Sequence, residues 1–162
     1  MPSKQLTIEQ ALTLLAEAPP RIATLTADLA PAQLHAVPTP GEWSASDVLA
    51  HLRACADVWG GHILAMIAED APTRRGVNPR TWITKTDYLE LEFRVSFRSF
   101  ATQRADLLAI LESLPPKGWS RTATVMAWGS PIERTVLHYA ERLALHERPH
   151  LKQIERIANA IQ

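Results

Sequence analysis

Hydrophobic residues recur at alternating spacings of three and four through most of the chain, and no stretch shows the sustained alternation of a strand. This pattern predicts an all-α protein. Four amphipathic segments carry it, at residues 7–29, 44–71, 86–114 and 130–162. Proline-rich connections separate these segments, so the simplest arrangement is an antiparallel four-helix bundle that forms a single domain over residues 1–162.

Prolines and a capping residue mark the limits of the first two helices. Pro19 and Pro20 predict a kink or a break within the first helix, because proline removes a backbone donor. Residues 30–43 form a long proline-rich first connection, with room for one helical turn. Ser44 begins the second helix as its cap. Residues 72–79 are polar and basic, which is typical of a mobile loop.

The last connection has a different character. Residues 121–128 are the most strand-like part of the chain and predict an ordered loop or a short hairpin before the last helix. Ser130 and Glu133 match a capping box, and Pro131 occupies the position that would follow the cap. We therefore expect the fourth helix to start at Ser130 and to run nearly to Gln162.

Composition narrows the function classes. The 17 basic and 17 acidic side chains balance, which argues against a nucleic-acid partner, since phosphate binding needs excess positive charge. The most apolar stretch, residues 48–68, contains four charged or histidine side chains and is not expected to span a membrane. Cys55 is the one cysteine, and the chain starts without the apolar block of a signal peptide, so a cytoplasmic protein acting on a small molecule is expected.

Two histidines interrupt the hydrophobic seam of the fourth segment. His146 and His150 are four residues apart, so they project from the same helical face and can reach one metal ion. A third ligand must come from another helix. His51 is the best candidate, because it lies beside the hydrophobic stripe of the second segment. Core histidines that are satisfied by hydrogen bonds are the alternative interpretation of this pair.

The other three histidines fit the same site poorly. His62 lies about 16 Å along the helix from His51, and His138 about 12 Å from His146. His35 falls in the first connection. We expect these three to titrate as ordinary histidines.

Residues 146–150 also match the H-E-x-x-H pattern of zinc peptidases, in which the glutamate is the general base. The match is weak. The 12 residues after His150 contain no His, Cys or Asp as a third ligand, and Pro149 would distort the motif. Glu147 points about 100° away from His146 and is predicted to be a surface residue.

Two short blocks carry a family resemblance. Residues 40–44, PGEWS, lead into the His51-Leu52 pair, and residues 146–151, HERPHL, are followed by Gln153-Ile154. Together with the four helical segments, these blocks resemble the DinB/YfiT-like superfamily of bacterial four-helix metalloproteins. The resemblance covers nearly the whole chain, but its specificity is concentrated in the two blocks.

The resemblance implies a divalent metal held by His51, His146 and His150, with zinc or nickel expected and iron compatible. It also implies a homodimer and a metal-dependent transferase or isomerase that uses a small thiol, such as bacillithiol, mycothiol or glutathione, on an electrophilic small molecule. A non-catalytic stress-response or binding protein clamped by its metal is the main alternative, and an HExxH-type metallopeptidase is a weaker one. Pro149 departs from the family pattern and leaves the Leu145 carbonyl without its helical donor, which bears on metal affinity.

Four further residues are candidates near the site. Arg104 could bind a substrate carboxylate, or its stem could pack across the bundle edge with its head in water. Cys55 could be a fourth ligand or a small buried hydrophobic residue. Asp47 and Arg142, each one turn before a predicted ligand, could support the ligands or could be ordinary helix-end and surface charges.

Overall fold

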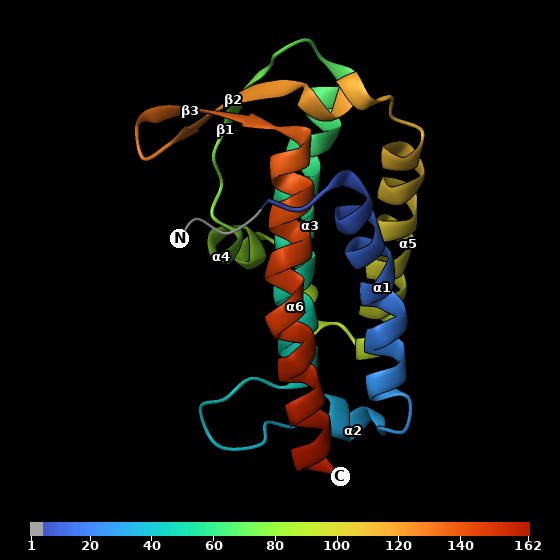
Figure 1. Ribbon diagram of the computed structural model, residues 1–162. Helices are drawn as coiled ribbons and strands as arrows, with labels where there is room; N and C mark the ends of the chain where they lie inside the picture. Colours follow the sequence, from blue (N-terminus) through green and yellow to red (C-terminus); the bar gives the residue numbers. More distant parts are fainter. Residues whose placement is uncertain (1–4) are drawn as a thin grey trace.

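Four long helices form the body of the molecule in a computed structural model that describes residues 5–162 (Figure 1). They are α1 (Ile8–Thr26), α3 (Ala45–Ala68), α5 (Phe93–Glu112) and α6 (Val136–Ile161). Helix α6 packs against α3 and α1, and α5 packs against the other sides of the same two helices. The predicted four-helix bundle is confirmed.

The helix directions give the bundle an uncommon connectivity. Helices α1 and α6 run in one direction, and α3 and α5 run in the opposite direction (Figure 1). Helix α3 is therefore antiparallel to α6 but parallel to α5. This arrangement requires a long crossover between the top of α3 and the bottom of α5, and residues 69–92 provide it.

Eight short elements complete the described part of the chain, residues 5–162. They are α2 (Pro31–Leu34), β1 (Thr73–Arg75), α4 (Pro79–Trp82), η1 (Ile83–Lys85), η2 (Tyr88–Glu90), η3 (Pro116–Ser120), β2 (Thr122–Ala127) and β3 (Ser130–Thr135). The predicted mobile loop at residues 72–79 therefore contains a strand. The third long helix was predicted to start near Thr86, but it begins at Phe93, because residues 79–90 fold into separate short turns.

Side-chain caps set the start of the helices. Ser44 Oγ accepts a hydrogen bond from the Asp47 amide at 3.0 Å, and Asp47 Oδ2 accepts one from the Ser44 amide at 2.9 Å. This capping box satisfies two amides that the helix leaves free. Pro19, Pro20 and Pro149 lie inside α1 and α6, and both helices continue through them. Pro19 and Pro20 therefore do not break α1, although a kink or a break was predicted there.

The fourth long helix begins six residues later than the sequence indicated. Residues Ser130–Thr135 pair with Thr122–Ala127 as antiparallel strands, so the Ser130 capping box is not used. Thr135 caps α6 instead, by accepting a hydrogen bond from the His138 amide at 3.0 Å. A hairpin partner is available to these residues, and strand pairing satisfies their backbone groups better than an added helical turn.

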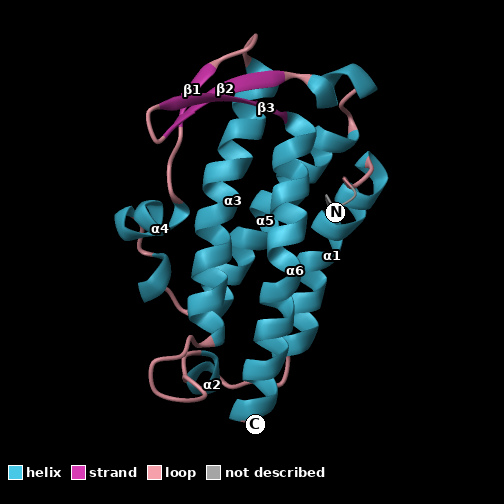
Figure 2. Cartoon of the chain, turned by 60° about the vertical axis from the view of Figure 1, so that its left-hand side comes forward, coloured by secondary structure: helices cyan, strands magenta, loops and turns pink. Residues whose placement is uncertain are grey.

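A small sheet covers the top of the bundle (Figure 2). Strand β2 lies in the middle, parallel to β1 and antiparallel to β3. Trp128 and Gly129 connect β2 to β3 with φ angles of 53° and 77°. Two consecutive positive φ angles are typical of the tight turn whose twist matches a β-hairpin. Of the two forms predicted for residues 121–128, an ordered loop or a short hairpin, the structure has the hairpin, but its second strand uses residues that were predicted to be helical.

Helix α3 is the most deeply buried of the long helices. Sixteen of its 24 residues are buried, because α6 and α5 cover two of its sides and the crossover segment covers a third. Asp57 fastens that segment to α3. Its carboxylate accepts hydrogen bonds from Trp82 Nε1 at 2.9 Å, Tyr88 Oη at 2.5 Å and Gln103 Nε2 at 2.8 Å.

Candidate metal centre

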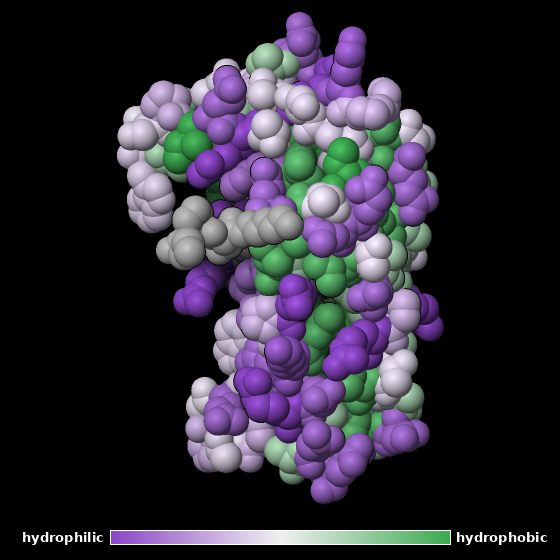
Figure 3. Space-filling view, viewed as in Figure 1, coloured by the Kyte–Doolittle hydropathy of each residue, from purple (hydrophilic) through white to green (hydrophobic). Residues whose placement is uncertain are grey.

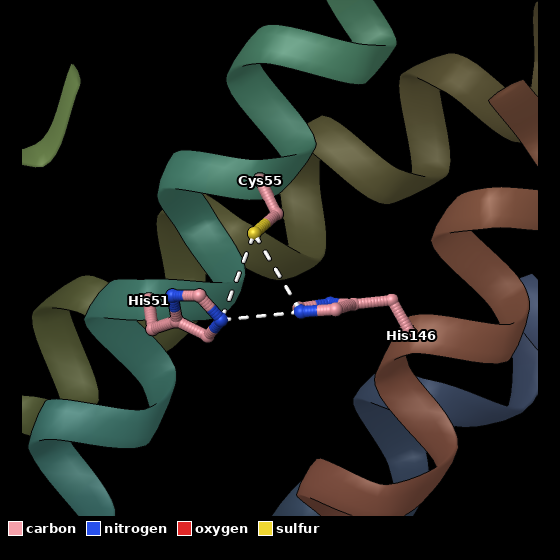
Figure 4. Close-up of side chains that lie close together, drawn as sticks. All are labelled: His51, Cys55 and His146. Atoms are coloured by element: carbon pink, nitrogen blue, oxygen red, sulfur yellow. Dashed lines mark hydrogen bonds between the residues drawn. The ribbon is translucent and has the colours of Figure 1, made fainter. Parts of the chain in front are cut away.

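Three potential metal ligands converge between α3 and α6 (Figure 4). Helix α3 contributes His51 and Cys55, and α6 contributes His146. The Nε2 atoms of the two histidines are 3.1 Å apart. Cys55 Sγ lies 3.8 Å from Nε2 of His51 and 3.9 Å from Nε2 of His146. All three ligand atoms thus lie within 4.8 Å of one another.

This spacing fits a small divalent ion. Two imidazole nitrogens that bind one tetrahedral ion lie about 3.4 Å apart, and a nitrogen and a thiolate sulfur about 3.6 Å apart. The observed separations of 3.1, 3.8 and 3.9 Å are close to these values. Imidazole and thiolate ligands together are typical of zinc and related transition metals. The donor set and its geometry therefore support metal binding.

His150 lies next to this group but outside its tightest part. Its ring centroid is 4.8 Å from that of His51 and 4.6 Å from that of His146. His150 Nδ1 is 2.8 Å from the amide oxygen of Gln153, which can only accept a hydrogen bond. An Nδ1–H that donates to this oxygen would leave Nε2 as the nitrogen able to bind a metal ion.

The site holds its ligands in their neutral forms. Burial lowers the pKa of His51 and of His146 to about 4, and nearby positive groups lower it further in the same direction. Burial, with a smaller contribution from Glu147, raises the pKa of the Cys55 thiol to about 12. Neutral imidazoles are the form that binds metals, whereas the thiol would have to lose its proton to an incoming ion.

Two indole rings enclose the histidines. The Trp43 ring lies 5.4 Å from that of His51, and the Trp59 ring lies edge-on to that of His146 at 5.1 Å. The guanidinium of Arg142 stacks 4.7 Å above Trp59. Arg142 thus reaches the site through an aromatic ring and does not contact a ligand. Such packing limits the rotamers that His146 can adopt.

Arg104 and Glu147 form a buried ion pair beside the site. Their side chains are only 2% and 3% exposed, and two hydrogen bonds of 2.8 and 2.5 Å join them. Arg104 also donates to the carbonyl of Leu15 at 3.0 Å, so the pair links α5, α6 and α1. Both sequence interpretations of Arg104 were wrong, as was the surface position predicted for Glu147. The cause is that α6 is covered on two sides, so a direction 100° from His146 is still interior.

The remaining candidates lie elsewhere. Asp47 is engaged in the Ser44 cap. His62 is buried at the top of the bundle, where burial and Arg74 lower its pKa to about 4. Burial also lowers the pKa of His138. The expectation that these two histidines titrate normally was therefore wrong, because the sheet and the hairpin cover the end of the bundle.

A pocket of about 670 Å³ opens beside the histidines. The first connection forms one wall of this pocket, and about the last three turns of α6 form the other. His150 and Gln153 are among its lining residues, so the pocket reaches the edge of the histidine cluster. Its lining residues are Pro38, Thr39, Glu42, Trp43, His150, Gln153, Arg156, Ile157 and Ala160.

Fold and site together define a four-helix-bundle protein with an internal histidine and cysteine cluster. The model of the DinB superfamily matches residues 14–154, and the chain belongs to this superfamily. Among solved structures, the fold is similar to that of YfiT from Bacillus subtilis, described as a probable metal-dependent hydrolase with an unusual four-helix bundle topology. That similarity has a TM-score of 0.77 at 16% identity and covers 98% of this chain and 91% of YfiT. No curated protein matches the sequence.

The sequence did not reveal Gln153, Trp43 and Trp59 as neighbours of the ligands. Gln153 lies three residues after His150, a spacing that places both side chains on one helical face. That signal was present. The positions of the two tryptophans depend on how α3 packs against α6.

None of the described helices is both long and apolar enough to cross a membrane.

Proposed function

We propose that this protein binds a divalent metal ion through His51, His146 and His150 and transfers a small thiol to an electrophilic molecule. The observation that carries the metal part is the 3.1 Å approach of two neutral imidazole nitrogens from different helices. A hydrogen bond or a cation between the two nitrogens accounts for this distance, and the Cys55 sulfur, 3.8 and 3.9 Å from the same two nitrogens, favours a cation. The thiol part rests on the resemblance to characterised members of the family.

The chain's own residues would position the ion and the reactants. Gln153 orients His150, and the two tryptophans hold the rings of His51 and His146. A divalent ion bound here would lower the pKa of a thiol that coordinates it. In the proposed transfer the thiol proton goes to solvent, the sulfur forms a bond to the electrophilic carbon, and the leaving group departs with the bonding electron pair.

Metal content is the first test. The protein is purified without a polyhistidine tag, incubated with zinc or with nickel, freed of excess metal and measured for bound metal. We expect about one ion per chain, and a stoichiometry near zero would refute the proposal. His35→Ala is a suitable control variant, because His35 is exposed and lies outside the cluster.

The thiol is tested on cobalt-substituted protein. Bacillithiol, mycothiol or glutathione should change the ligand-field absorption spectrum of the cobalt if its sulfur enters the coordination shell. An unchanged spectrum with all three thiols would refute the proposed thiol transfer, but it would not contradict the proposed metal site.

A metal-clamped binding protein is the second candidate. Cys55 favours it, because a thiolate together with three imidazoles would fill a tetrahedral shell and leave no position for a substrate. The pocket beside His150 favours the enzyme. The metallopeptidase is disfavoured, because Arg104 occupies both carboxylate oxygens of the glutamate that would have to act as base.

A further inference from the structure

The pocket beside His150 has a lining that selects for one kind of ligand. Trp43, Ile157 and Ala160 supply apolar surface, and His150 marks the end of the pocket nearest to the histidine cluster. In Figure 3 the outer surface near the C-terminal end of α6 is mainly hydrophilic. The pocket therefore provides an apolar wall inside a polar surrounding.

Two opposite charges face this pocket, Arg156 from α6 and Glu42 from the first connection. Among the described residues, neither side chain forms an ion pair or a side-chain hydrogen bond with another group. Both are exposed, so their charges remain available to a ligand. Arg156 is carried by the same rigid helix as His150, whereas Glu42 lies on a connecting segment.

We propose that this pocket binds a small organic anion, with its carboxylate paired to Arg156 and its apolar part against Trp43 and Ile157. A guanidinium offers two parallel donors that match a carboxylate. The inference rests on the proposed function at one point: a divalent ion held by neutral imidazoles adds positive charge at the inner end of the pocket. With that ion, positive charge outweighs the single negative charge of Glu42.

Three probes of the same shape test this proposal: 4-phenylbutyrate, 4-phenylbutanol and 4-phenylbutylamine. Each is titrated into zinc-loaded protein and followed by ¹H–¹⁵N NMR. We expect 4-phenylbutyrate to bind most tightly, with the largest amide shifts at residues 38–43 and 153–160. An exposed ion pair with a carboxylate is expected to give a preference of about three- to fivefold over the alcohol, and the amine should bind most weakly.

Three charge-neutralising variants give three different expected results. Arg156→Gln should abolish the preference for 4-phenylbutyrate over the alcohol. Glu42→Gln should increase that preference, because it removes a repelling charge. Lys152→Gln removes an exposed cation one turn before Arg156 that does not line the pocket, and it should change nothing.

The proposal is overturned if the alcohol or the amine binds as tightly as the acid. It is equally overturned if Arg156→Gln keeps the full preference, which would mean that the carboxylate binds the zinc alone. Repeating the titration after zinc removal separates this inference from the proposed function. Bound zinc without an Arg156-dependent preference refutes only the anion pocket, whereas an Arg156-dependent preference in a chain that never binds zinc refutes only the metal site.

Discussion

Helices α3 and α6 bring histidines together at two levels, and only one level has the geometry of a metal site. In the lower level, His51 and His146 direct their Nε2 atoms at each other, with Cys55 beside them. In the upper level, the rings of His62 and His138 each lie 5.0 Å from the ring of Tyr139, which lies next to His138 in the chain.

The difference between the levels lies in what the ring nitrogens face. Nδ1 of His62 is 3.4 Å from Nε of Arg74, which can only donate, so this nitrogen acts as an acceptor toward a cation. Nε2 of His138 is buried and has no hydrogen-bond partner among the described residues; Nδ1 of His146 in the lower level shares this state, but Nε2 of His146 faces His51 and Cys55. Two histidines on facing helices therefore do not make a metal site unless their nitrogens share one point in space.

The largest expected effect concerns the buried ion pair of Arg104 and Glu147, which lies beside the lower histidine level. Glu147→Gln leaves the buried Arg104 without its counter-charge and should reduce the free energy of unfolding by about 3–5 kcal/mol. Glu155→Gln is the matched control, because Glu155 lies on the same helix as Glu147 but pairs with Arg21 of α1, and both side chains of that pair are about half exposed. Its effect should stay below about 1 kcal/mol. Denaturant unfolding of both variants checks the comparison, and equal effects would contradict it.

The second prediction separates the two histidine levels directly. His146→Ala should weaken zinc binding by about 3–4 kcal/mol, one ligand's share of the roughly 10–16 kcal/mol typical of a tetrahedral zinc site. His138→Ala, on the same helix, should leave zinc affinity unchanged. Competition with a chromogenic chelator measures both affinities. A similar loss in the two variants would show that the upper level also holds metal.

The third prediction uses the pH dependence of the upper level. The pKa of His62 is about 4 in the folded protein and about 6.5 in the unfolded chain, so the unfolded state binds the proton first as pH falls. The stability that neutral His62 contributes is thus present above pH 6.5 and is lost toward pH 4. Between about pH 7.5 and about pH 5 this loss amounts to about 2 kcal/mol.

Comparison with a variant isolates this contribution from other acid-sensitive groups. The free energy of unfolding of wild type should fall by about 2 kcal/mol more than that of His62→Gln over the same pH interval. Urea unfolding at several pH values measures the difference. Parallel pH curves for the two proteins would show that His62 is not held neutral by the fold.

The smallest expected effect concerns Cys55. Cys55→Ser should weaken metal binding by about tenfold, or about 1.4 kcal/mol. If Cys55 is the fourth ligand of a metal clamp, Cys55→Ser should also remove a sulfur-to-cobalt charge-transfer absorption in the near-ultraviolet from the cobalt-substituted protein, whereas in the proposed enzyme that absorption requires an added thiol. Cys55→Ala serves as a second variant that keeps the site apolar. If the absorption band persists in both variants, Cys55 is not a ligand, and the cluster depends on its histidines alone.

Periodicity was sufficient to predict the bundle and the approach of His51 to His146, because both follow from amphipathic helices with apolar seams. The hairpin was also foreseeable from strand-like residues 121–128. The residue at which α6 begins was not foreseeable from the sequence. Ser130 carries a good local capping signal, and only the pairing of β3 with β2 overrides it.

The error at Glu147 has the same origin. A charged residue off the main seam is usually solvent-exposed, and a single helix gives no sign that α1 and α5 close over it. The Arg104 position in the third seam was the available clue, since a cation at a core position needs an anion from another helix. Long-range partners of this kind cannot be derived from one helix's periodicity.

The three hydrogen bonds on Asp57 have a consequence for the time scale of backbone opening. Two of them, from Trp82 and Tyr88, hold the crossover segment against α3, and the third, from Gln103, joins α5 to it, so this helix is shielded on three sides. Its amide hydrogens should therefore exchange with deuterated solvent only through opening of the whole bundle, while those of α4 and the first connection exchange through local fluctuations. His51 and Cys55 are thus attached to the part of the backbone that is expected to open least often, whereas the first connection, which forms one wall of the pocket beside His150, is expected to open through local fluctuations.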